Sequence, residues 1–374
     1  MLRNGQVEFN NKTKLQSCKM KNLSQVERIK IKLNLAKNTD SFFEVFGADS
    51  HRYRLDSPID IKEVETFEKK YNISLPDGYK VFLTQIGNGG NERTTVVGNS
   101  GAGPDYGIFK LGHKYHFCMG YPANTTSEYL MKEPFFDTKT TKEDWEKISE
   151  NMPEDISDDE YDKEFKRVYA GTFTIGFSGC SGFLGIMLTG EDTGRVVHMC
   201  DELEYCPQFA KEANFLDWYE NWLDSIIWRK SFGGRKPYGT EEEHFVRYST
   251  VENVHKPDTV QHWKIVALGY IRGFDSLSAK YAEELWKNYH METDETVKLY
   301  ILDLLVKFDY EKAKIELDKL YKRNALGFLR ILHLYAKEKT SDWQNVIQKL
   351  QDESSNPEVT EYIKYVTISD CSIK

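Results

Sequence analysis

The sequence predicts two successive parts, an α+β domain and an all-α domain. The first is expected to hold a mixed or antiparallel sheet flanked by helices, and the second to be a solenoid-like helical repeat. Before residue 235, short apolar or alternating segments lie between glycine-rich turns, as in a sheet. Beyond it, apolar residues recur only at helical spacing. The 374 residues suffice for two or three domains. We place an N-terminal tail at residues 1–22, the α+β domain at 23–235 and the helical domain at 236–374.

Three helices are predicted at the start of the first domain. Residues 23–36 have helical character. The next helix has Ser57 or Asp60 as its cap, and Glu63 stands three residues beyond Asp60, the spacing of a capping box. It closes at Leu75, because a residue before proline avoids the α region. A short helix over residues 77–86 follows.

Glycine-rich turns and strands are expected next. Residues 87–90 and 101–107 are interpreted as tight turns leading into a strand over 108–111. Neither segment has the Lys-Ser/Thr ending or the strand–helix setting of a phosphate-binding loop. Residues 128–164 predict an acidic helical insertion or loop. Further strands are expected over 169–175, 183–188 and 195–199, with a hairpin turn at 190–194. An amphipathic helix then packs its stripe on the sheet: Phe215, Trp218, Tyr219, Trp222, Leu223, Ile226 and Ile227.

The second domain shows a degenerate repeat. After a linker predicted over residues 231–240, four apolar stripes begin at Trp263, Val297, Phe328 and Val359, which are 34, 31 and 31 residues apart. Partner helices begin near Ala279, Ala313 and Trp343. Two helices in each repeat of this length are typical of an α-solenoid of the TPR or HEAT kind. Such arrays bind proteins or brace a neighbouring domain.

Charge is spread unevenly along the chain. The net charge is −9, but residues 141–228 hold 20 acidic and 7 basic residues, so the rest of the chain is positive. The dense acidic run is interpreted either as a solvated loop or as a docking surface for a basic partner. An acidic surface argues against nucleic acid as a ligand, because phosphate contacts need lysine and arginine. The candidate partner-binding residues are Glu154, Asp155, Asp158, Asp159, Glu160, Asp162, Asp201, Glu202 and Glu204.

The compartment is predicted from cysteine usage and from the first residues. The six cysteines are scattered, which suits free thiols in a reducing compartment better than a disulfide framework. The polar, lysine-rich start does not have the apolar region of a secretory signal. No apolar run approaches the ~20 residues that cross a bilayer. We therefore expect a cytoplasmic protein with no membrane partner.

No catalytic or metal-binding constellation is evident from the spacing of reactive residues. Cys180 with His198 would be a thiol nucleophile and its base, but no orienting Asn or Asp can be assigned, and a turn between strands accounts better for residues 176–182. Two sets of residues would offer zinc ligands without the usual spacing: His113, His116 and Cys118, and His198, Cys200 and Cys206. We expect no catalytic residue, no metal and no cofactor.

The ordered set of motifs over residues 23–228 resembles the SUKH superfamily, which includes yeast cell-wall-synthesis regulators and many bacterial proteins. The segments that carry the resemblance are Phe46-Gly47-Ala48, His51-Arg52-Tyr53, Leu75-Pro76, Gly87-Asn88-Gly89-Gly90, Gly101-Ala102-Gly103-Pro104, Leu188-Thr189-Gly190, Gly194-Arg195-Val196 and Phe215-Leu216 with Trp218 and Trp222. The helical half lies outside this resemblance.

The resemblance implies a non-enzymatic function. Bacterial members look like immunity proteins that neutralise polymorphic or contact-dependent toxins, often nucleases with basic faces. The expected partner is therefore a cognate toxin domain bound by the acidic residues above. The alternative, suggested by the fungal members, is a regulatory scaffold that binds endogenous proteins of cell-envelope synthesis through the helical repeats.

Overall fold

The computed structural model describes residues 23–90, 101–113, 129–150, 157–200, 203, 205–230 and 239–367. The chain divides into two compact units. One contains the chain up to Leu33 and Ser50–Leu223, and the other contains Asn34–Asp49 and the chain from Asp224 onward. Helices α2 (Gln25–Thr39), α3 (Ala48–His51) and α8 (Phe215–Ile227) each contribute residues to both units. The linker predicted over residues 231–240 lies almost entirely outside the described residues.

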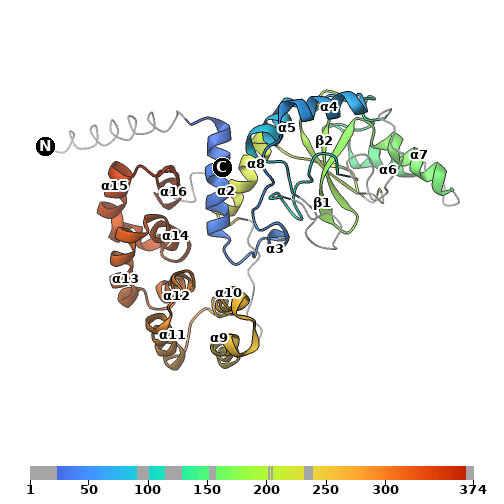
Figure 1. The fold of residues 1–374 in the computed structure, drawn as a ribbon. Coiled ribbons are helices and arrows are strands. Elements are labelled where there is room, and N and C mark those ends of the chain that lie inside the picture. Colours follow the sequence, from blue (N-terminus) through green and yellow to red (C-terminus); the bar gives the residue numbers. More distant parts are fainter. Residues whose placement is uncertain are drawn as a thin grey trace. The chain divides into compact units, whose positions relative to one another are not determined.

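The first unit is built on a four-stranded antiparallel sheet in the order β1-β2-β3-β4 (Figure 1). Its strands are β1 (Thr172–Gly179), β2 (Gly182–Met187), β3 (Val196–Cys200) and β4 (Gln208–Phe209). Cys180 and Ser181 form the turn between β1 and β2, with Cys180 at φ 48°. The sheet and its hairpins confirm the predicted α+β class, and residues 176–182 form the predicted turn and its flanking strand ends.

Helices α4 (Ile61–Tyr71), α5 (Asp77–Val81) and α8 cover one face of the sheet. The π-helical turn Phe82–Ile86 continues α5. Phe173 of β1 lies 6.1 Å from Phe67 and 6.3 Å from Tyr79 between ring centroids, and Tyr79 in turn lies 5.0 Å from Phe215. This face therefore closes on an aromatic core.

Asp60 is the cap of α4. Its carboxylate accepts a hydrogen bond from the Lys62 amide at 2.8 Å, and the Glu63 carboxylate accepts one from the Asp60 amide at 3.3 Å. The predicted capping box is confirmed, with Asp60 rather than Ser57 as the capping residue.

Two predicted strands need correction. Residues 108–111 form only single bridges, from Ile108 and Phe109 to neighbouring segments, and the Leu111 amide bonds to the Asn88 side chain at 2.9 Å instead of to a strand. The strand expected over 169–175 begins at Thr172, because the Tyr169 amide still bonds to the Phe165 carbonyl at the end of a helix.

Over residues 239–367, the second unit has eight α-helices in four successive hairpins (Figure 1). They are α9 (Glu241–Val254) with α10 (Val260–Ile271), α11 (Ala279–Met291) with α12 (Glu295–Phe308), α13 (Tyr310–Arg323) with α14 (Ala325–Tyr335), and α15 (Gln344–Glu353) with α16 (Pro357–Thr367). The second helix of each hairpin packs on the next, which confirms the predicted solenoid-like repeat. The four stripes predicted from the sequence are α10, α12, α14 and α16, and α9 is the additional helix.

The segment Asn34–Asp49 packs on these second helices. The Thr39 hydroxyl lies 3.2 Å from the Tyr362 hydroxyl on α16, and the Phe42 ring lies 4.8 Å from that of Tyr300 on α12. Arg272, at the end of α10, pairs with Glu44. Residues far apart in the sequence thereby complete the core of the helical unit. Within the described ranges, no helix is both long and apolar enough to cross a bilayer.

Candidate functional site

The acid-rich part of the first unit forms two helices, α6 (Lys142–Glu150) and α7 (Asp158–Val168), on the sheet face opposite α4 and α8. Their apolar residues enter a core with the sheet residues Phe177, Phe183, Met187, Val197 and Met199. Trp145 from α6 is 2% exposed, and Phe165 from α7 is also buried. The acidic helices therefore rest on a packed aromatic core.

Two long-range hydrogen bonds connect α6 and the residue after α7 to the end of β3 and to Leu203 beyond it. The Trp145 indole donates to the Leu203 carbonyl at 3.0 Å, and the Tyr169 hydroxyl donates to the Cys200 carbonyl at 2.7 Å. Burial raises the pKa of Tyr169, so its hydroxyl remains a donor at neutral pH. We call α6, α7 and the described residues Cys200, Leu203 and Tyr205 the acidic platform.

The structure places four of the nine predicted partner-binding residues on α7. Asp158, Asp159, Glu160 and Asp162 occupy four of its first five positions. Asp159 is exposed and has no hydrogen-bond or ion-pair partner among the residues that the structure describes. The remaining five lie outside the described residues: Glu154, Asp155, Asp201, Glu202 and Glu204.

Glu160 helps to cap the N-terminus of α7. The Ser157 hydroxyl donates to its carboxylate at 2.7 Å, and the Glu160 amide returns a bond to that hydroxyl, forming a capping box. The hydrogen bond from Ser157 lowers the pKa of Glu160, which therefore stays ionised. Acidic side chains near a helix N-terminus also interact favourably with the helix dipole. Part of the negative charge therefore stabilises α7 itself.

Helix α6 adds acidic residues that the sequence argument did not single out. Asp144 and Glu146 each pair with a lysine on the same helix, and a hydrogen bond from Thr141 lowers the pKa of Asp144. Glu143 is exposed and has no such partner within the described ranges. A tryptophan inside an acidic segment was the available signal that α6 is anchored, because tryptophan is rarely left on a solvated helix.

The acids of the β2–β3 turn are compensated. Glu191 pairs with Lys139 at 2.6 Å, and Asp192 pairs with Arg195 at 3.2 Å. Arg167 and Glu164 likewise pair on the last turns of α7. Among the acids of α6, α7 and this turn whose side chains the structure describes, Glu143 and Asp159 are therefore the ones without a partner.

Cys180 and His198, considered above as a nucleophile and its base, lie in different environments. Cys180 is exposed in the β1–β2 turn, whereas His198 is half-buried in β3, paired with Leu184 in the sheet. Burial lowers the pKa of His198, and the charge of Asp105 opposes that shift. Asp105 is the acidic neighbour that spacing did not reveal, because it lies more than 90 positions earlier in the chain.

The residues considered as zinc ligands are dispersed. His113 stacks on Phe109 at 4.2 Å, Cys200 is buried, and Cys206 bonds weakly to backbone carbonyls. His116 and Cys118 lie outside the described residues. Where the structure describes the chain, no three His, Cys, Asp or Glu side chains gather in a metal-binding group.

The comparison with known families identifies the domain that carries this platform. Residues 58–221 match the SMI1/KNR4 family (SUKH-1), whose members are generally non-catalytic immunity or regulatory proteins. The searches of curated proteins and of solved structures found no match. The match includes the sheet, α4 to α7 and most of α8, and it ends before the helical hairpins. Residues 58–221 of this chain are therefore a SUKH-1 domain of the SMI1/KNR4 family.

Proposed function

We propose that this chain is a non-enzymatic immunity protein that binds and neutralises a cognate bacterial toxin domain through the acidic platform. One observation carries the proposal. The acid-rich helices α6 and α7 rest on one aromatic core, and the hydrogen bonds Trp145–Leu203 and Tyr169–Cys200 connect this part of the chain to the end of β3 and to Leu203. Glu143 and Asp159 are exposed and pair with no described residue, so part of this charge is not consumed by internal ion pairs.

The partner that such a surface fits is a basic protein face. A nuclease-type toxin presents lysine and arginine where it holds phosphate, and an acidic platform competes with phosphate for those groups. The field of the segment 141–228 speeds association and disfavours acidic partners. Because Glu143, Asp159 and Glu160 are exposed, we expect salt to weaken the interaction, with a screening length of about 8 Å at physiological ionic strength.

A pull-down from the native host, with mass spectrometry of the retained proteins, tests the proposal. We expect one toxin domain at equal stoichiometry, released by salt, whose activity falls when this chain is added. Several endogenous envelope or signalling proteins retained by the helical region would instead support the regulatory scaffold and overturn the immunity function.

A charge-matched pair of variants locates the surface. The test variant neutralises three acids of α7 and two acids that precede it in the sequence: Asp158→Asn, Asp159→Asn and Glu160→Gln, with Glu154→Gln and Asp155→Asn. Glutamine at position 160 keeps the capping box. The control neutralises five exposed acids elsewhere: Glu65→Gln, Glu242→Gln, Glu283→Gln, Glu311→Gln and Asp352→Asn. We expect the test variant to lose toxin binding while the control retains it. Equal binding by both would exclude the platform as the binding surface.

A further inference from the structure

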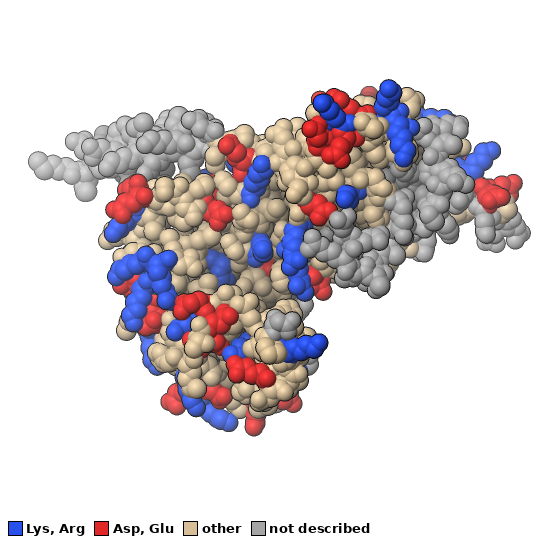
Figure 2. Space-filling model, viewed as in Figure 1, with Lys and Arg blue, Asp and Glu red and all other residues tan. Residues whose placement is uncertain are grey.

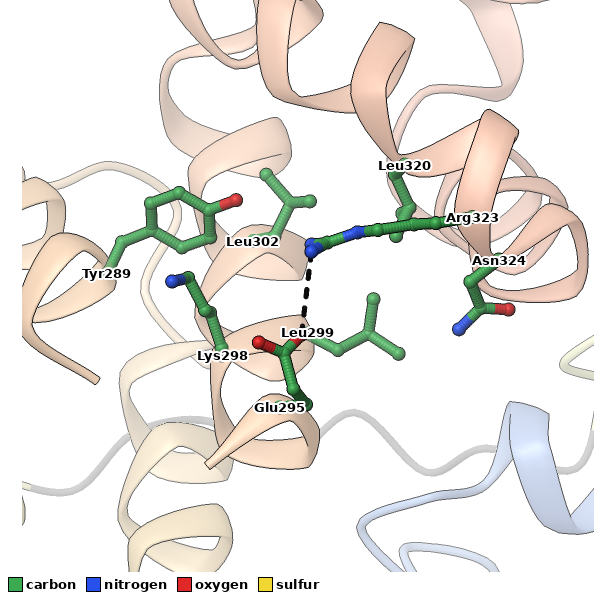
Figure 3. A pocket seen from close by; sticks show the side chains of 8 residues that line it. All are labelled: Tyr289, Glu295, Lys298, Leu299, Leu302, Leu320, Arg323 and Asn324. Atoms are coloured by element: carbon green, nitrogen blue, oxygen red, sulfur yellow. Dashed lines mark ion pairs between the residues drawn. The ribbon is translucent and has the colours of Figure 1, made fainter. Parts of the chain in front are cut away.

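A separate pocket lies within the helical unit, between α11, α12 and α13 (Figure 3). Its volume is about 210 Å³. The leucines Leu299, Leu302 and Leu320 line it, together with Tyr289 and Asn324. It belongs to the second unit alone, so its existence does not depend on the acidic platform.

Two cations reach into this pocket from different helices. Lys298 on α12 and Arg323 at the end of α13 approach from opposite sides, as Figure 3 shows. The Lys298 ammonium lies 5.2 Å from the centroid of the Tyr289 ring and has no carboxylate partner among the described residues. The Tyr289 hydroxyl donates to Glu316 at 3.0 Å, which fixes this wall of the pocket.

One acidic side chain lies at the rim. Glu295 reaches Arg323 at 3.5 Å, drawn as the dashed line in Figure 3, and both side chains are more than half exposed. An exposed ion pair at this distance contributes little, so Arg323 is available to another carboxylate. With one acid against two cations, the lining has a net positive charge.

The volume of the pocket and the residues that line it indicate which class of ligand fits. Pockets for cofactors and drug-sized molecules are typically about 300–1,000 Å³, so this one suits a single side chain better. A free inorganic anion gains nothing from a leucine floor, whereas the methylene stem of a glutamate covers leucine while its carboxylate meets the cations. The surfaces of stacked helical repeats commonly bind protein segments.

We propose that this pocket receives a glutamate side chain from an acidic segment of a partner protein, with the carboxylate between Lys298 and Arg323 and the stem on Leu299, Leu302 and Leu320. The charge of this partner is opposite to that of the toxin face proposed above. The two sites therefore serve different segments or different proteins, and either proposal can fail without the other.

Methyl NMR on the full chain with labelled leucines tests the pocket directly. The probe is the peptide acetyl-Gly-Leu-Glu-Leu-Gly-amide, and its glutamine counterpart is the control ligand. We expect the methyl signals of Leu299, Leu302 and Leu320 to shift on titration with the glutamate peptide, and less with the glutamine peptide. No shift at these methyls, or equal shifts with both peptides, would overturn the proposal. Equal affinity for inorganic phosphate would reduce the pocket to a simple anion site.

Three pocket variants and one control are expected to change the affinity for the glutamate peptide in different directions. A purely structural role of these residues would not produce this pattern. Lys298→Gln and Arg323→Gln should each weaken the glutamate peptide about three- to tenfold. Glu295→Gln should strengthen it, because it removes the competing carboxylate. Lys349→Gln, an exposed lysine on α15, changes the net charge equally and should leave affinity unchanged. If Glu295→Gln weakens binding, or Lys349→Gln matches Lys298→Gln, the pocket assignment is wrong.

Discussion

The acidic platform and the interior of the helical unit hold charge in different ways. The platform rests on an aromatic core, and its acids Glu143, Asp159 and Glu160 are exposed. In the helical unit, an acidic and a basic side chain lie together in the core. Asp303 on α12 is fully buried and pairs with Arg330 on α14, which is 4% exposed. On the face of the helical unit in Figure 2, basic and acidic side chains are intermingled rather than segregated.

This contrast distinguishes charged residues that stabilise the fold from charged residues that are available to bind a partner. A buried pair is kept because removing one partner strands the other in the protein interior. A surface acid without a partner stabilises the fold very little, so its accumulation needs another explanation. The predictions below follow from this contrast.

The largest expected effect is on the buried pair. Asp303→Ala leaves Arg330 buried without its carboxylate and should lower the free energy of unfolding of the helical unit by about 3–5 kcal/mol. Urea unfolding followed by far-ultraviolet circular dichroism measures the loss. The exposed Glu353→Ala is the control, and the double variant Asp303→Leu with Arg330→Met should recover most of the stability. A decrease of less than about 1 kcal/mol in the free energy of unfolding would contradict the structural role assigned to this buried pair.

Each unit also contains a buried neutral histidine. Burial lowers the pKa of His51 in the first unit and of His333 in the second to about 4. The Tyr53 amide donates to His51 Nδ1 at 3.0 Å, so a proton added at that nitrogen breaks this hydrogen bond. His333 Nε2 donates to the Ile227 carbonyl at 2.7 Å, so a proton added at Nδ1 has no acceptor among the described residues.

The pH dependence follows from these shifts. The unfolded chain protonates these rings near pH 6.5, well before the folded protein does. Stability should therefore fall as the pH drops from about 6.5 to 4, by up to about 3 kcal/mol for each histidine, and stay flat above pH 7. Unfolding of His51→Gln and His333→Gln across this range measures each slope. An unchanged slope in both variants would assign the pH dependence to other groups.

The sequence predicted elements whose cause is local. The capping box of Asp60 and Glu63 lies within four residues, and the stripes of α10, α12, α14 and α16 are periodic, so both could be identified without a structure. The hairpin turn at 190–194 and the turn at Cys180 follow from glycine spacing in the same way. The membership of residues 58–221 in SUKH-1 was recognisable from the order of such motifs.

Features with non-local causes were not predictable. The hydrogen bond from Trp145 to Leu203 spans 58 residues. In the segment 108–111, the Leu111 amide bonds to the side chain of Asn88, which lies 23 residues earlier, instead of to a strand. Asp303 lies on a helix like many exposed acids, and only its packing against Arg330 shows that it is buried. Of the candidate site, the charge was evident from the sequence, whereas its aromatic anchor was not.

A moderate effect is expected at that anchor. Trp145→Phe keeps an aromatic ring but leaves the buried Leu203 carbonyl without its donor, which should cost about 2 kcal/mol of local stability. Hydrogen exchange in α6 and α7 measures the loss. Trp263→Phe, at a partly exposed tryptophan on α10, is the control. Exchange rates equal to those of the control would mean that the platform is not held through this bond.

The smallest effect compares the caps of one helix from each unit. Ser157 on α7 and Thr240 on α9 form the same capping box with a glutamate three residues later. Ser157→Ala and Thr240→Ala should each cost about 1 kcal/mol, seen as faster amide exchange in the first turn of the respective helix. A much larger loss at Ser157 would show that the fold of α7 depends on its cap rather than on the aromatic core.

The most direct test of the central claim is the salt dependence of binding to the captured toxin domain. Affinity is measured by calorimetry at low and at physiological ionic strength, for the wild type and for Glu143→Gln with Asp159→Asn. The platform predicts that wild-type binding weakens steeply with salt, and that the variant binds more weakly at low salt with a flatter dependence. Wild-type and variant curves that coincide at every ionic strength would contradict an interaction through the acidic platform.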